Sequence, residues 1–75
     1  MLFSELNAGD HARVIGFAAE NKAYRQKLMA MGLTKGALFS VLRQAPLGDP
    51  FHITVRGTSL SLRKYEANIL QVERI

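Results

Sequence analysis

Apolar and polar residues alternate along several short stretches of this chain, and this alternation predicts β-strands. In the clearest stretch, FHITVR at 51–56, three apolar side chains share one face and polar side chains share the other. The run SLSLR at 59–63 alternates in the same way after a short turn at Gly57-Thr58. Two alternating runs joined by a short glycine turn are typical of a β-hairpin.

Three further stretches predict strands. The run 11–18, HARVIGFA, follows turn residues, and Gly16 inside it indicates a bulge or a close backbone approach. The run 37–44, ALFSVLRQ, follows a turn at Gly36 and is apolar on both faces, so this strand is either central or covered by a helix. The run 70–75, LQVERI, completes the set.

The period changes to that of a helix over residues 22–31. Tyr24, Leu28 and Met31 fall on one helical face, and Gly32 is expected just past the C-terminus, where the backbone turns left-handed. A helix this short needs packing against the rest of the chain to be stable.

Two loops flank these elements. Asn21 is expected to cap the helix N-terminus. The segment 45–50, APLGDP, places one glycine between two prolines that lack N–H donors, and a strand follows it. A phosphate-binding loop needs successive free N–H groups at a helix N-terminus, so this segment is interpreted as a turn that directs the strand.

The elements together predict a mainly β fold: a small barrel of about five strands with one packed helix and one helical turn near KYEANI at 64–69. Closure into a barrel removes exposed sheet edges. A chain of 75 residues forms one domain, 1–75. The expected core is Val14, Leu28, Phe39, Val41, Phe51, Ile53, Val55, Leu60, Leu62, Ile69 and Val72.

Composition points to a soluble, cytoplasmic domain. The chain has no cysteine, no basic segment typical of a signal peptide at its start, and no apolar run near the roughly 18 residues of a membrane span. The formal net charge is +4, and the basic side chains concentrate after residue 20. This charge is compatible with an acidic protein, anionic lipid or nucleic acid as partner, and also with solubility alone.

Side chains that could carry chemistry do not form a recognisable site. The serines lack a nucleophile-elbow motif, and no two acids lie at general acid–base spacing within one element. His11 and His52 each have an aspartate nearby, but a tight metal site needs three or four converging ligands. We therefore predict no enzyme activity, no catalytic residue, no cofactor and no metal site.

One surface stands out as a candidate for binding a partner. Met29 lies off the apolar line of the helix, and methionine adapts to varied partner surfaces. Arg25 and Lys27 flank it. With Tyr24 and Leu33, these residues are the predicted contact surface.

The order of elements and several motifs resemble the FeoA family of small accessory proteins of bacterial ferrous iron transport. These motifs are the helix ending in MGL at 31–33, the Gly36 turn, APLGDP at 45–50, and a tail running from Leu62 through AxIxxVE at 67–73. The resemblance covers about residues 6–73.

This resemblance implies an SH3-like β-barrel that assists Fe(II) uptake by binding and modulating the membrane permease FeoB, whose cytoplasmic part is a GTPase. It implies no catalytic or metal-binding residues. The same small domain resembles the C-terminal module of DtxR-type repressors. Their DNA-reading and metal-binding domains have no counterpart in this sequence, so a repressor function is not expected.

Two alternatives belong to other classes. A nucleic-acid-binding small barrel would account for the basic charge, but Phe39 and Phe51 are needed in the core and are not expected to stack on bases. An Fe(II) chaperone would use His11, His52 and acidic side chains. The leading prediction remains a permease-binding module that does not bind nucleic acid.

Overall fold

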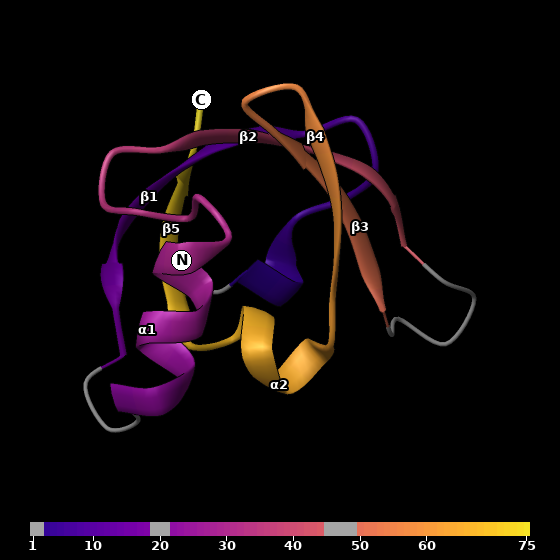
Figure 1. Cartoon of the computed structure of the whole chain (residues 1–75). Coiled ribbons are helices and arrows are strands. Elements are labelled where there is room, and N and C mark those ends of the chain that lie inside the picture. The colour runs from indigo at the N-terminus through magenta and orange to yellow at the C-terminus, as the bar shows by residue number, and fades with distance from the viewer. Residues whose placement is uncertain (1–2, 19–21, 45–49) are drawn as a thin grey trace.

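The computed structural model contains five antiparallel strands, a helix and two short helical segments (Figure 1). It describes residues 3–18, 22–44 and 50–75. The expected N-cap Asn21 and most of the expected turn at 45–50 lie outside these ranges. The elements in chain order are η1 (Phe3–Glu5), β1 (His11–Phe17), α1 (Lys22–Ala30), β2 (Leu38–Gln44), β3 (Phe51–Val55), β4 (Thr58–Leu62), α2 (Lys64–Ala67) and β5 (Leu70–Arg74).

The strands form one bent sheet in the order β4-β3-β2-β1-β5, in line with the small barrel that alternation predicted (Figure 1). Among the described residues, β4 and β5 each pair with one neighbour, so the expected removal of sheet edges by closure is incomplete. The central place of β2 confirms one of the two interpretations of its apolar pattern. Its outward-facing Leu38 and Leu42 nevertheless remain more than half exposed, at 56% and 52%, so neither α1 nor α2 covers them. Strands β1 and β5 pair from Ala12 with Arg74 to Phe17 with Leu70, which joins an early strand to the last one.

The turn of the β3–β4 hairpin lies one residue earlier than the sequence suggests. Val55 pairs with Thr58, so the turn consists of Arg56 and Gly57 and not of Gly57-Thr58. Both turn residues have positive φ angles, 52° and 77°. This is the conformation of a two-residue type I′ turn, whose twist matches that of the flanking strands.

Gly16 occupies a β-bulge, as predicted. The register between β1 and β5 shifts between Val14 and Gly16. A Cβ atom at this position would lie 3.2 Å from Oε1 of Gln71, so the side chain of Gln71 on β5 comes close to the glycine. The bulge bends β1 and helps the sheet to curve.

The core confirms most of the predicted buried residues. Nine of the eleven are buried, while Leu60 and Ile69 are partly buried against the same cluster. The alternation of β3 is fully realised, because Phe51, Ile53 and Val55 all face inward. The core also includes seven residues outside that set: Phe3, Leu6, Ala12, Leu33, Ala37, Ala67 and Leu70. Of these, Leu70 lies on the face of the last strand that alternation directs inward.

The segment η1 supplies the largest unpredicted part of the core. Phe3 is completely buried, and its ring stacks on Phe39 with a centroid distance of 5.3 Å. The same ring meets Phe51 edge-to-face at 5.0 Å. Figure 1 shows η1 lying between the two helices and the sheet, so this short segment fills the interior of the barrel.

Leu33 is wrongly predicted as a surface residue, because the end of α1 turns it into the core. Gly32 has φ of 97°, and its N–H donates to the carbonyl of Met29. The N–H of Leu33 donates to the carbonyl of Leu28. These two bonds define a Schellman motif, in which the residue after the glycine packs on the last turn of the helix. Both leucines are fully buried.

Within the described ranges, no helix is long and apolar enough to cross a membrane.

Candidate functional site

Helices α1 and α2 lie side by side near one end of the barrel (Figure 1), where Tyr24 contacts Tyr65 and Lys27 bonds to Glu66. Arg25 and Met29 lie farther around α1, away from these contacts. Four of the five predicted contact residues lie on α1: Arg25, Lys27 and Met29 are exposed, and Tyr24 is partly exposed. The fifth, Leu33, is in the core. Sequence reasoning missed that α2 contributes as well. We call Tyr24, Arg25, Lys27, Met29 and Tyr65 the α1–α2 surface.

A buried carboxylate ties the two helices together. Glu66 is 5% exposed, and its Oε2 accepts a hydrogen bond of 2.7 Å from Lys27 Nζ. Its Oε1 accepts the backbone N–H of Arg63 at 3.2 Å, which caps the start of α2. The hydrogen bond from Lys27 lowers the pKa of Glu66, and the bond to Glu66 raises the pKa of Lys27. Lys27 is thus a structural tether as well as an exposed cation.

Two tyrosines form the aromatic part of the surface. The rings of Tyr24 and Tyr65 meet edge-to-face with centroids 5.7 Å apart. A hydrogen bond with Tyr24 is the main cause of a raised pKa at Tyr65. Tyr65 remains 60% exposed, and Met29 is 37% exposed. Exposed aromatic and methionine side chains on a fixed base are typical of protein-binding surfaces.

The charge of this region is strongly positive. Exposed Lys22, Arg25, Lys27, Arg63 and Lys64 come from α1 and the start of α2. Glu66, the acid within these two helices, is buried and already bonded to Lys27. This arrangement favours an acidic partner, because like charges across an interface are strongly unfavourable.

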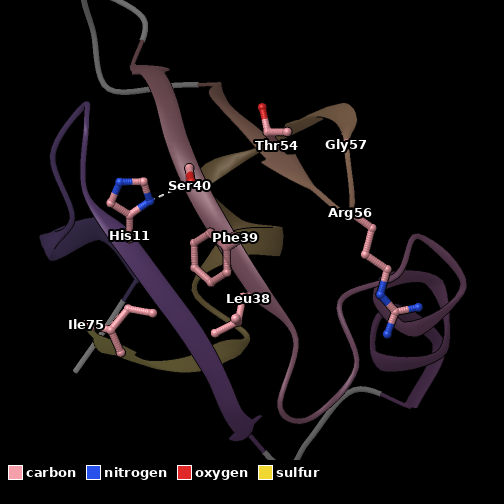
Figure 2. Close-up of a pocket in the computed structure, with 8 residues that line it drawn as sticks. All are labelled: His11, Leu38, Phe39, Ser40, Thr54, Arg56, Gly57 and Ile75. Atoms are coloured by element: carbon pink, nitrogen blue, oxygen red, sulfur yellow. Dashed lines mark hydrogen bonds between the residues drawn. The ribbon is translucent and has the colours of Figure 1, made fainter.

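A second candidate site lies on the outward face of the sheet (Figure 2). This pocket of about 330 Å³ is lined by His11, Leu38, Phe39, Ser40, Thr54, Arg56, Gly57 and Ile75. We call it the sheet-face pocket. Its residues come from β1, β2, β3, the hairpin turn and the last residue of the chain, so no single sequence motif could have revealed it. Pairing of His11 with Ser40 and of Ser40 with Thr54 places three polar side chains in a row.

The two histidines are not brought together. Nδ1 of His11 shares a hydrogen bond of 2.8 Å with Oγ of Ser40, on the outward face of β1 and β2. His52 lies on β3, where it pairs with Arg43 and Ser61. Asp49, the acid expected near His52, lies outside the described residues. Among the residues that the structure describes, no three histidine, aspartate or glutamate side chains gather as a metal site would require.

Comparison with known proteins places this architecture in a family. A sequence model of the FeoA domain matches residues 1–74. The Fe(2+) transport protein A/Fe(2+) transporter FeoB fusion protein of Porphyromonas gingivalis is 32% identical over all 75 residues. The chain spans only 9% of the length of that relative.

Solved structures agree in fold. The FeoA protein of Chlorobium tepidum is 47% identical and superimposes with a TM-score of 0.89, covering 100% of this chain and 70% of the other. FeoA of Stenotrophomonas maltophilia, solved with zinc, is 29% identical with a TM-score of 0.83, covering 97% of this chain and 89% of the other. It is described as a prokaryotic SH3 domain protein that possibly acts as an activating factor of ferrous iron transport. The chain belongs to the FeoA domain family.

Proposed function

We propose that this chain is a non-catalytic accessory domain of bacterial ferrous iron uptake, which binds the cytoplasmic GTPase part of an FeoB-type permease and modulates its transport cycle. The observation that carries the proposal is the Porphyromonas gingivalis protein, in which a domain 32% identical to the whole of this chain is fused to an FeoB transporter. Fusion of two domains in one chain holds them at high local concentration, which favours partners that work together. The domain acts at the cytoplasmic face of the membrane.

The α1–α2 surface is the proposed contact. It combines exposed Tyr65 and Met29 with a cluster of cations, and the Lys27–Glu66 bond holds the two helices in a fixed relation. A surface that is rigid before binding loses less entropy when it docks. The partner patch is accordingly expected to be acidic with an apolar centre.

The binding test uses this protein immobilised on a biosensor. The purified permease and, separately, its soluble GTPase domain are passed over it with GDP and with a non-hydrolysable GTP analogue. Binding to the GTPase domain that differs between the nucleotides supports modulation of the transport cycle. If neither sample binds in any nucleotide state, the proposal is wrong. A parallel titration with random oligonucleotides at about 50 mM salt tests the nucleic-acid alternative.

A pair of matched variants tests the surface. Arg25→Glu with Met29→Asp reverses charge and removes an apolar contact without touching the Lys27–Glu66 bond. Leu42→Asp with Arg43→Glu makes the same chemical change on exposed residues of β2, on the sheet. We expect the first variant to weaken permease binding at least tenfold and the second to leave it unchanged. Equal effects of the two variants would refute the surface assignment.

A further inference from the structure

The sheet-face pocket shares no lining residue with the α1–α2 surface, and the proposed function makes no use of it. We propose that this pocket binds an extended acidic peptide segment of a partner protein, with an apolar side chain of the peptide resting on Leu38 and Ile75 and a carboxylate meeting Arg56.

The apolar part of the pocket is formed by side chains that pack poorly against their own protein. Leu38 is 56% exposed and Ile75 is 60% exposed, although Leu38 belongs to the central strand of the sheet. Phe39, a core residue that is 3% exposed, completes this part of the lining. Covering such exposed side chains with a ligand removes apolar surface from water and is therefore favourable.

The polar lining selects for negative charge. His11, Ser40, Thr54 and Arg56 contribute hydroxyl, imidazole and guanidinium groups, and no acid is among the lining residues that the structure describes. Two acids near this face already have cationic partners, so their negative charge is balanced. Glu73 accepts hydrogen bonds from Arg13, and Oδ2 of Asp10 lies 3.2 Å from Nη2 of Arg74.

Arg56 has no carboxylate partner within the described part of the chain. Its Nη2 reaches the hydroxyl of Thr34 at 3.5 Å, the outer limit of a hydrogen bond. Since a guanidinium carries five N–H donors, a paired interaction with a carboxylate remains open to it. Lys35, next to Thr34, adds an exposed cation in the same loop.

The backbone at Arg56 also indicates a function. Among the described residues it alone combines a positive φ with a side chain, at 52°. The first position of a type I′ turn strongly prefers asparagine, aspartate or glycine. A large side chain held in this conformation is a strained feature, and such features concentrate at ligand sites. Arginine is an unfavourable residue at this turn position. Binding of a ligand by its guanidinium would account for its presence there.

The shape of the pocket favours an extended chain over a compact small molecule. Figure 2 shows His11 on one side of β2 and Arg56 on the other, with Leu38 farther along that strand. A small molecule would leave much of its surface in water here, whereas small-molecule sites usually bury about 70–90% of the ligand. An extended peptide can span the three strands and place alternate side chains into the pocket.

Three hexapeptides test the proposal by NMR titration of the ¹⁵N-labelled protein. Each is acetylated and amidated: ELESLE, QLQSLQ and KLKSLK. We expect ELESLE to shift the amide signals of Leu38, Ser40, Thr54, Arg56 and Gly57 and to saturate below about 1 mM. The uncharged peptide should bind at least tenfold more weakly, and the basic peptide should cause no saturable shift.

Two variants separate a specific site from general attraction between opposite charges. Arg56→Asn keeps a residue that tolerates the turn but removes the guanidinium, and it should weaken ELESLE binding at least tenfold. Arg43→Gln removes the same charge from an exposed position of β2 that belongs to neither candidate site, and it should leave binding unchanged. The proposal is overturned if the two variants behave alike, if the glutamate and glutamine peptides bind equally, or if the shifts map to α1 and α2. These outcomes concern the sheet-face pocket alone and leave permease binding by the helices untouched.

Discussion

At Arg56 a backbone conformation that lowers stability is combined with a side chain that we propose binds a ligand. Its left-handed backbone costs an ordinary side chain about 1–2 kcal/mol, and asparagine largely avoids that cost. We therefore expect Arg56→Asn to raise the free energy of unfolding by about 0.5–1 kcal/mol, measured by urea denaturation.

A substitution at Gly57, the second residue of that turn, should change stability in the opposite direction. It has φ of 77°, and no atom lies within 4 Å of the position that a Cβ would take, so Gly57→Ala adds strain without a clash. We expect this variant to lose about 1 kcal/mol. An unchanged stability in Arg56→Asn would show that the turn is relaxed with arginine, which would remove one argument for the sheet-face pocket.

Glu66 makes stability depend on pH. Its pKa is lowered from an ordinary value of 4.5, chiefly by the hydrogen bond from Lys27, so between the two values the unfolded chain binds more protons than the folded chain. The contribution of Glu66 is complete above about pH 4.5 and is lost as the pH falls through the lowered pKa. We expect Glu66→Gln to cost on the order of 1–2 kcal/mol at pH 7 and much less in acid.

Urea denaturation from pH 7 to pH 3 measures this difference. The curves of the parent protein and Glu66→Gln should converge as the pH falls below about 4.5. Parallel curves across that range would mean that Glu66 does not titrate as a bonded carboxylate.

Two residues illustrate what the sequence could and could not predict. Burial of Leu33 was predictable, because an apolar residue directly after the C-terminal glycine of a helix commonly packs on the last turn. Its assignment as a contact residue ignored that motif. Burial of Phe3 was not predictable from periodicity, since three residues of η1 are too few to display a period.

At the level of elements, η1 is small but central to packing. Phe3→Ala removes a ring that contacts both Phe39 and Phe51 and leaves a cavity in the core. Such substitutions cost about 3–5 kcal/mol, comparable with the whole stability of a small domain. We expect this variant to be largely unfolded at 25 °C by circular dichroism and NMR.

Phe3→Leu is the matched control, because it keeps an apolar side chain of substantial volume at the same place. It should remain folded with a smaller loss of stability. If Phe3→Ala loses less than about 1 kcal/mol, η1 is not part of the cooperative core.

Alternation located the strands well because each inward face is continuous. In β3 every second residue is apolar and buried, and the same pattern placed Val72 of β5 inside. The pattern could not tell an outward apolar residue from a covered one, so it left the environment of Leu38 and Leu42 undecided. It also placed the hairpin turn one residue too late, because period two does not mark where pairing ends.

At the level of the whole molecule, β5 completes the sheet by pairing with β1 along one edge. Deleting residues 70–75 removes Leu70, Val72 and every hydrogen bond of that strand pair. We expect the shortened protein to lose its dispersed amide spectrum. Deleting Ile75 alone removes one backbone hydrogen bond, to His11, and should leave the protein folded. A dispersed spectrum after the longer deletion would show that four strands suffice.

The candidate sites were predictable to different degrees for a topological reason. Most of the α1–α2 surface comes from one helix, so the spacing of its residues along the sequence was enough to group them. Tyr65 comes from α2, and its place beside Tyr24 could not be predicted in this way. The sheet-face pocket joins residues from position 11 to position 75, and only strand pairing brings them together. A pattern read along the chain describes one strand at a time.

The place of Ile75 at the rim of the sheet-face pocket has a practical consequence for any chain joined to this end. A segment following Ile75 through a short flexible linker would meet the pocket at an effective concentration in the millimolar range. An acidic tag fused there would compete with an added peptide as an intramolecular ligand, and a weak site would already be occupied. Protein prepared for binding measurements should therefore carry its tag elsewhere or have it removed.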